Sequence, residues 1–95
     1  MAKEKILKFD PIEIQSVEFK TITVKAPNFK EAKAILAGVN FDEKGGLSPD
    51  SLAIVSERTL LLCGTSPNGP VIQELIDQLP YKTVMEAGMF SLSFM

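Results

Sequence analysis

A formal charge of −2 on 95 residues, of which 45% are hydrophobic and 23% charged, is typical of one small globular domain and argues against a disordered chain, so we treat 1–95 as a single domain. The only arginine is Arg58, and the seven lysines among the first 36 residues are interleaved with five acidic residues, which leaves no clustered basic face of the kind that binds nucleic acid. No run approaches the roughly 18 apolar residues of a membrane-spanning helix, and "MAKEKILKF" has no apolar core of signal-peptide length, so we expect neither a membrane span nor a signal peptide.

The front of the chain predicts an antiparallel β-hairpin over residues 5–25. Apolar and polar side chains alternate within 5–14 and again within 17–25, as they do in strands with one buried face. The two residues between these segments, Gln15 and Ser16, form the expected turn, although the pair lacks the Asn-Gly signal of a tight hairpin.

Two features predict that the pairing of these strands is irregular. Pro11 has no N–H to give to a sheet ladder, so it marks a bulge, an edge or the end of a strand. In the second strand the apolar residues change parity at Lys20-Thr21, which also indicates a bulge or a twist. After this change, Ile22 and Val24 lie on one face of the strand.

Residues 28–95 predict three to four short helices, which are recognised by their first residues. Asn28, followed three residues later by Glu31, has the pattern of a capping box. Ser48 before Pro49 is a strong helix start, because serine caps well and proline is tolerated at the first helical position. The expected helices cover residues 29–37, 49–63, 70–78 (opened by Pro70) and a last segment that begins at Tyr81.

The second helix and the last segment bear most on the packing. The segment 49–63 is apolar on several sides, so we expect it to be central and contacted from more than one side. In the last segment Gly88 interrupts the helical pattern, and residues 89–95, "MFSLSFM", fit a helix or a strand equally well. The predicted fold class is therefore α+β, with an N-terminal antiparallel β-hairpin followed by a bundle of three to four short helices.

No motif predicts catalysis, a metal or a cofactor. The chain has no histidine, which removes the commonest general base and metal ligand. Cys63, the only cysteine, lies in the apolar stretch "LLLCG" and is best explained as a core residue of a protein from a reducing compartment. Asp42 and Glu43 lack the oxygen spacing of a calcium loop, and Glu74 and Asp77 are most simply solvated charges. We therefore expect a protein that is not an enzyme.

The remaining features are those of protein binding. A β-hairpin has edges with unpaired backbone groups, and such an edge can accept a strand from another chain. The last residues are rich in Met and Phe, whose adaptable apolar side chains suit partners of varying sequence, although they also serve to complete a core. The residues that we expect to bind protein are Ile22, Val24, Phe90, Leu92, Phe94 and Met95.

The order of these segments resembles that of the tail assembly chaperones of long-tailed bacteriophages. The likeness rests on a strand ending in "PIEI", a second strand "TITVKAP", a helix ending in "LLLCGTS" and the closing stretch "IQELIDQLPYKTVMEAGMFSLSF". It covers nearly the whole chain, in arrangement rather than in identity. The sequence departs from the family pattern at Lys25, where the family favours arginine, and at Asn28, where it favours threonine, and "CGTS" replaces a more usual "TGLS".

The resemblance implies a function in building the phage tail. It implies that the chain binds the tape-measure protein, and tail-tube subunits, in the cytoplasm of the host cell, and that it forms homo-oligomers. A long and partly apolar tape measure must be kept soluble until the tube covers it, and many weakly bound copies would achieve this by mass action. Family members often exist in a short form and a frameshifted longer form, between which the sequence does not distinguish.

Two other functions remain open. A small phage- or plasmid-borne inhibitor that docks on a host enzyme has the same profile of a small acidic domain without catalytic residues. Such an inhibitor binds one partner with a fixed stoichiometry, whereas a chaperone self-associates and binds an elongated partner in several copies. A nucleic-acid-binding module is the least favoured function, because one arginine among 10 basic residues provides little grip on phosphate.

Overall fold

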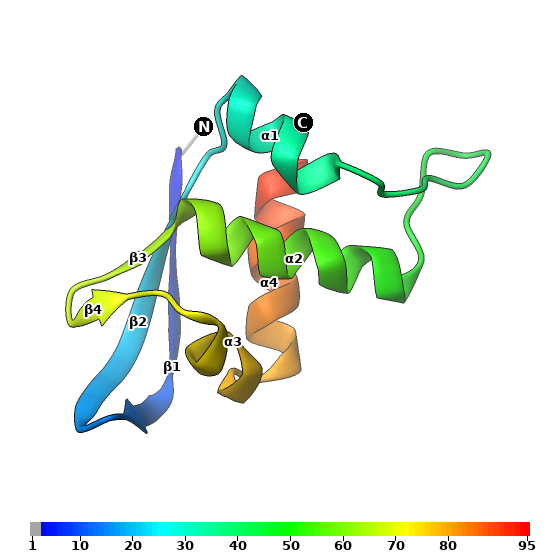
Figure 1. Cartoon of the computed structure of the whole chain (residues 1–95). Helices are drawn as coiled ribbons and strands as arrows, with labels where there is room; N and C mark the ends of the chain where they lie inside the picture. The colour runs from blue at the N-terminus through cyan, green and yellow to red at the C-terminus, as the bar shows by residue number, and fades with distance from the viewer. Residues whose placement is uncertain (1–2) are drawn as a thin grey trace.

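The computed structural model describes residues 3–95 and shows an α+β fold (Figure 1). A four-stranded antiparallel sheet in the order β1-β2-β3-β4 forms one layer, and the helices form a second layer on one side of it. The elements along the chain are β1 (Glu4–Ile14), β2 (Val17–Lys25), α1 (Phe29–Leu36), α2 (Pro49–Cys63), β3 (Gly64–Ser66), β4 (Gly69–Pro70), α3 (Gln73–Gln78) and α4 (Tyr81–Leu92).

Strands β1 and β2 form the predicted hairpin, and their pairing confirms the predicted irregularity. The register holds as far as Lys8↔Thr21 and resumes at Ile12↔Phe19, so three residues around Pro11 lie opposite one residue of β2. The side-chain alternation of both strands changes at this bulge, which keeps apolar side chains on the helix-facing side along the whole hairpin. The buried residues of this face are Leu7, Ile14, Phe19, Ile22 and Val24.

The turn between β1 and β2 holds two non-glycine residues in the left-handed conformation. Gln15 has φ 51° and Ser16 has φ 68°. Because Ile14 pairs with Val17, this is a two-residue hairpin loop of the kind that matches the twist of the flanking strands. Positive φ is unfavourable for residues with a side chain, so the long strands on either side impose this turn on its sequence.

Two short strands extend the sheet beyond the predicted hairpin. Strand β3 pairs with β2 through Thr23↔Thr65, and β4 pairs with β3 through Thr65↔Pro70. The prediction that Pro70 opens a helix is therefore wrong, because Pro70 belongs to β4 and α3 begins at Gln73. Strand β4 lies at the edge of the sheet, where proline is tolerated because no further strand needs its missing N–H.

Helices α1 and α2 begin where the sequence predicted. The Asn28 side chain accepts a hydrogen bond from the Glu31 N–H at 2.8 Å, and the Asn28 N–H donates to the Glu31 carboxylate at 3.0 Å, which confirms the capping box. The Ser48 Oγ accepts a hydrogen bond from the Ser51 N–H at 3.1 Å, and Pro49 is the first residue of α2.

The last segment of the chain is helical. Helix α4 extends to Leu92, and the backbone N–H groups of Phe94 and Met95 donate to the carbonyl groups of Ser91 and Leu92 at 3.1 Å each. Of the two structures that the sequence left open for residues 89–95, the helix is therefore the one adopted.

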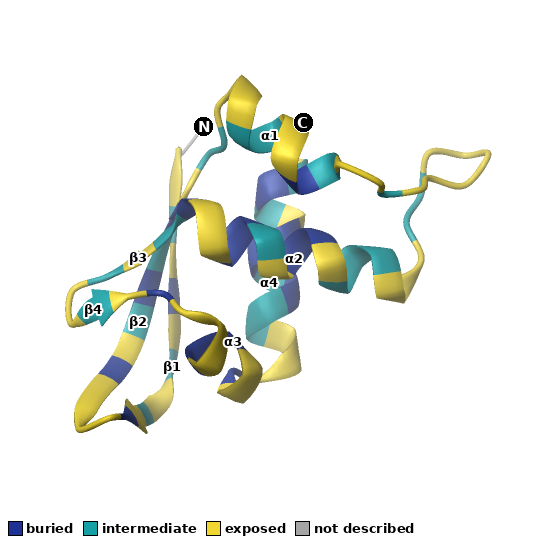
Figure 2. Ribbon diagram, viewed as in Figure 1, coloured by how far each residue is buried: buried dark blue, intermediate teal, exposed yellow. Residues whose placement is uncertain are grey.

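Helix α2 is central, as predicted, and crosses α4 at close range. It contacts α1, α3, α4, β2 and β3. A Cβ atom on Gly88 of α4 would lie 2.0 Å from the Ser56 Oγ of α2, so the two helices can approach this closely only because Gly88 has no side chain. Buried residues gather at this crossing and on the helix-facing side of the sheet (Figure 2). The sequence pattern showed Gly88 only as an interruption, whereas the structure shows a packing requirement.

Candidate protein-binding groove

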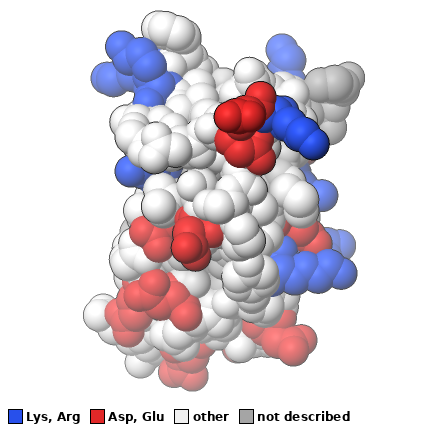
Figure 3. Space-filling model, turned by 90° about the vertical axis from the view of Figure 1, so that its right-hand side faces the viewer, with Lys and Arg blue, Asp and Glu red and all other residues white. Residues whose placement is uncertain are grey.

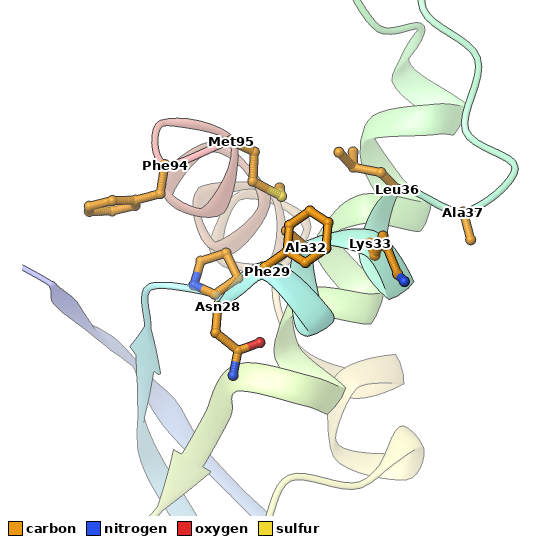
Figure 4. A pocket seen from close by; sticks show the side chains of 9 residues that line it. Asn28, Phe29, Ala32, Lys33, Leu36, Ala37, Phe94 and Met95 are labelled. Atoms are coloured by element: carbon orange, nitrogen blue, oxygen red, sulfur yellow. The ribbon is translucent and has the colours of Figure 1, made fainter.

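An apolar groove lies between α1 and the C-terminal end of α4 (Figure 4). Its volume is about 530 Å³. In Figure 4 the Met95 side chain extends toward α1, whereas the Phe94 ring points away from Leu36. The apolar residues that line the groove are Pro27, Phe29, Ala32, Leu36, Ala37, Phe94 and Met95. Together with Lys33 they define what we call the α1–α4 groove.

A second hollow continues the α1–α4 groove past Leu36 and Met95, which line both. Its volume is about 490 Å³, and within residues 3–95 no charged side chain lines it. The rest of its apolar wall comes from the α1–α2 loop, α2 and α4, through Phe41, Leu47, Leu52, Met89 and Leu92. The two hollows therefore form one continuous apolar surface along one end of the molecule.

Several large apolar side chains of this surface are open to solvent. The exposed fraction is 79% for Phe29, 55% for Met89, 47% for Phe41 and 40% for Met95. Fully burying a side chain of this size contributes roughly 1.5–3 kcal/mol, so a partner that covered even part of this surface would gain a substantial binding free energy. Contiguous exposed apolar surface of this kind is typical of interaction sites.

Hydrogen bonds and an ion pair hold the N-terminal end of α1, which forms one wall of the groove. In addition to the capping box, Glu31 Oε2 lies 3.1 Å from Lys25 Nζ at the end of β2. The hydrogen bond from the Asn28 N–H and the charge of Lys25 lower the pKa of Glu31, and together they outweigh desolvation, which raises it. Glu31 is therefore ionised at neutral pH and links α1 to the sheet.

Arg58 of α2 holds the other end of α1. Its Nη1 donates hydrogen bonds to the carbonyl groups of Ile35, at 3.0 Å, and Ala37, at 2.6 Å. Carbonyl groups at the end of a helix have no partner within the helix, and a guanidinium group satisfies them well. The only arginine of the chain thus supports the wall of the groove.

The structure brings four of the six predicted binding residues together at the end of α4. Phe94 and Met95 line the α1–α4 groove, and Leu92 lines the second hollow. Phe90 is half-buried against the core, and its ring meets the Phe94 ring edge-on with 5.1 Å between centroids. Phe90 therefore orders the Phe94 ring but contributes no wall to either hollow.

The prediction that Ile22 and Val24 form a binding face is wrong. Both side chains have an exposed fraction of 0% and belong to the hydrophobic core. Alternation placed them correctly on one face of β2, but this is the face that the helices cover. Neither side chain can contact a partner while the protein stays folded.

Sequence reasoning missed the side of the groove that α1 provides. Phe29, Ala32 and Leu36 lie at i, i+3 and i+7, a spacing that places them along one stripe of the helix. The neighbouring Ile35 is fully buried, whereas Phe29 is largely exposed. The apolar stripe was visible in the sequence, but the spacing alone does not reveal which part of it faces the core and which faces a partner.

Cys63 and the carboxylates are the candidate ligands for a metal ion among residues 3–95. Cys63 is buried, as predicted, and burial raises the pKa of its thiol to about 11, with the nearby charge of Glu31 adding to the shift. Within residues 3–95, the cysteine and carboxylate side chains form no group of three that could hold a metal ion. In the same part of the chain, no helix combines the length and the apolar character needed to cross a membrane.

Comparison with known proteins found no matching family model, no matching curated protein and no matching solved structure. The functional interpretation therefore depends on the groove and on the resemblance in segment order.

Proposed function

We propose that this chain is a non-catalytic binding protein that acts as a tail assembly chaperone, holding apolar segments of a phage tape-measure protein. The observation that supports this proposal best is the continuous apolar surface formed by the α1–α4 groove and the second hollow. Its exposed Phe29, Phe41, Met89 and Met95 offer binding free energy that the isolated chain does not use. The resemblance in segment order supplies the identity of the partner.

The composition of the surface fits a partner of varied sequence. Met95 lies where the two hollows meet, and Met89 lines the second hollow. Methionine is unbranched and polarizable, so it adjusts its shape to different apolar side chains. A chaperone that covers many segments of a long partner needs this tolerance more than it needs high affinity for one segment.

The proposal extends to the assembly in which the chaperone acts. Several copies cover one tape measure in the cytoplasm of the host cell, contact one another and give way to tail-tube subunits as the tube forms. Each copy needs only a weak interaction, because occupancy is set by the free concentration relative to the dissociation constant.

The experiment that tests the proposal is co-expression of the chain with a tape-measure protein and a tail-tube protein, followed by mass measurement of the purified complexes. We expect several copies of the chain on each tape measure. Recovery of the tape measure without the chain would contradict the proposal, and a complex with one other protein at fixed stoichiometry would favour the docking inhibitor instead.

Variants of exposed residues connect this result to the groove. Replacing Phe29 and Met95 by Asp places charge in the groove, and we expect capture of the tape measure to fall at least tenfold with little change in helix content. The matched control is Tyr81→Asp, because Tyr81 is 69% exposed and lines neither hollow. Equal loss of capture in the control would show that the groove is not the contact surface.

A further inference from the structure

We infer that the occupant of the α1–α4 groove is an amphipathic helix that carries an acidic side chain to pair with Lys33. This inference rests on the proposed function and adds the conformation and the charge of the segment that binds. It depends on two observations, the helical walls of the groove and the uncompensated positive charge at its edge.

The walls of the groove favour an occupant whose backbone is already hydrogen-bonded. They are formed by α1, by the residues directly before and after it, and by Phe94 and Met95, which follow α4, so they offer mostly apolar side chains rather than a free sheet edge. An extended segment lying there would leave its own N–H and C=O groups without partners, whereas a helix satisfies them internally. Such helix-in-groove binding uses apolar side chains at i, i+4 and i+7 as anchors.

Strand addition has another possible location in this molecule, the outer edge of β1. There the bulge opposite Lys20 and the presence of Pro11 interrupt the regular row of backbone groups that an added strand would need. The apolar surface and the sheet edge thus point to different modes of binding, and the structure favours the groove.

The charge at the edge of the groove is positive. Lys33 is the only charged residue that lines either hollow within residues 3–95, and its Nζ lies 5.5 Å from the centroid of the Phe29 ring. Lys33 and Lys30 are exposed on α1, and in the described part of the chain neither forms an ion pair. The net charge of the chain is nevertheless −2, so the charge at this edge of the groove has the opposite sign to the net charge of the chain.

Acidic side chains gather toward the opposite end of the molecule, although Glu31 lies on α1, where it pairs with Lys25, and an acidic group is also visible beside a basic one in the upper half of Figure 3. Figure 3 shows acidic side chains concentrated in the lower half of this face, the end where Figure 1 places α3 with Glu74 and Asp77. An apolar helix with a carboxylate beside its anchors is therefore complementary to the groove and to the charge at its α1 edge. A second copy docked by two-fold symmetry at α1 would bring two Lys33 ammonium groups together, which disfavours self-association through this surface.

The test uses designed peptides of about 16 residues with leucine at i, i+4, i+7 and i+11 on an alanine and glutamine background. One peptide carries a glutamate beside the stripe at each end, and its partner carries lysines there instead. Binding is measured by fluorescence anisotropy at low salt. We expect the glutamate peptide to bind about three- to fivefold more tightly, the range of an exposed ion pair, and the preference to shrink at high salt.

Two protein variants make the assignment specific. Lys33→Glu should reverse the preference, so that the lysine peptide binds more tightly than the glutamate peptide. Lys82→Glu is the matched control, because Lys82 is exposed at the far end of α4 from Met95 and should leave the preference unchanged. A proline-containing peptide with the same leucines should bind at least tenfold more weakly, because it cannot form the helix.

The outcomes separate this inference from the proposed function. Equal affinity for the two charged peptides, no response to Lys33→Glu, or strong binding of the proline peptide would each overturn the inference even if the tape measure is captured. Concentration-dependent dimers that Phe29→Asp abolishes would also overturn it, in favour of a second copy as the occupant. Charge-dependent peptide binding without capture of tail proteins would support the inference and count against the proposed function.

Discussion

Gly88 shows how a single residue can matter more for packing than for helix propensity. In an isolated helix, replacing glycine by alanine is favourable by about 1 kcal/mol. Here the added Cβ would lie 2.0 Å from the Oγ and 3.1 Å from the Cα of Ser56, and only the Oγ can move aside by rotation. The clash with the backbone of α2 therefore outweighs the gain in propensity.

We predict that Gly88→Ala lowers the free energy of unfolding by about 1–3 kcal/mol, the range for overpacked cores. The measurement is the midpoint of urea denaturation followed by circular dichroism. Combining Gly88→Ala with Ser56→Gly should recover part of the loss, because the second change removes the Oγ and the Cβ that the new Cβ meets but leaves the Cα at 3.1 Å. Additive losses in the double variant would contradict a direct clash between these two residues.

Glu31 makes the stability of the α1 end depend on pH. Its pKa in the folded protein is lowered from 4.5, first by the Asn28 N–H and then by Lys25. A lowered folded pKa means that the stabilisation is fully present above the unfolded pKa and is lost as the pH falls through the folded pKa. The window of this effect therefore lies below about pH 4.5.

We predict that Glu31→Gln is less stable than the wild type at pH 7 and that the two stabilities converge as the pH falls below about 4.5. The measurement is thermal unfolding at a series of pH values. Lys25→Met should reduce the pH dependence only in part, because the contribution of the Asn28 N–H is the larger one and remains. A constant difference between wild type and Glu31→Gln at all pH values would contradict this origin of the shift.

At the scale of elements, α1 is a short helix held from both ends by other parts of the chain. Its eight residues are too few to be stable alone, because a helix must repay the entropy of its first turn. The capping box fixes its start, and the bonds from Arg58 to Ile35 and Ala37 fix its end. The shape of the α1–α4 groove therefore depends on contacts outside the groove.

We predict that Arg58→Met lowers the free energy of unfolding by about 1–3 kcal/mol, because it removes two charge-assisted hydrogen bonds and leaves the part-buried Ile35 carbonyl without this partner. In Arg58→Met, amide hydrogen exchange should be accelerated relative to the wild type in α1 more than in β1. Binding of a partner to the groove should weaken. Arg58→Lys keeps a charged nitrogen donor, and both hydrogen bonds come from the single nitrogen Nη1, so the loss of stability in this variant should be smaller. Unchanged protection of α1 in Arg58→Met would contradict the role of Arg58.

The helix starts could be predicted from the sequence because neighbours in the chain make each cap. Asn28 and Glu31 are three residues apart, and Ser48 stands directly before Pro49, so no distant contact is needed to recognise these boundaries. The bulge near Pro11 could be predicted for the same local reason, since proline lacks a donor and the parity of side chains changes opposite to it.

The short strands and the binding surface could not be predicted, because distant contacts decide them. Strand β3 has three residues, and it joins the sheet by pairing with β2, across a separation of about 40 residues in the chain. Alternation showed that Ile22 and Val24 share a face, but the helices that cover this face come later in the sequence. Likewise Phe29 became part of a groove because α4 ends beside it.

At the scale of the whole molecule, the helix-facing side of the sheet provides the stability of the fold, and the end that contains α1 provides the apolar surface. The helix-facing side of β1 and β2, together with α2, α3 and α4, provides one cluster of buried residues. The end formed by α1 and the residues that follow α4 keeps apolar side chains at the surface. Leu36, Leu47 and Leu92 belong to both, because they line a hollow and also pack against the core. The exposed Phe29, Phe41, Met89 and Met95 are outside the core cluster, so variants of these four residues can lose binding without unfolding.

The reactivity of Cys63 reports how often the core opens, because Cys63 lies in the core, at the junction between α2 and β3. Its side chain is 1% exposed, and burial raises its pKa to about 11, so both access and ionisation oppose its reaction with thiol reagents. A reagent can reach it only after the sheet and α2 separate. The rate of labelling at pH 8 should therefore follow the population of opened molecules.

We predict slow labelling of Cys63 in the native protein and immediate labelling in denaturant, measured by release of the chromophore from an aromatic disulfide reagent. Gly88→Ala should accelerate the native reaction about tenfold for each 1.4 kcal/mol of lost stability. The groove double variant Phe29→Asp with Met95→Asp should change the rate little, because these exposed residues lie outside the core. Equal rates in wild type and Gly88→Ala would mean that local opening at β3 exposes the thiol, and that the core is not one cooperative unit.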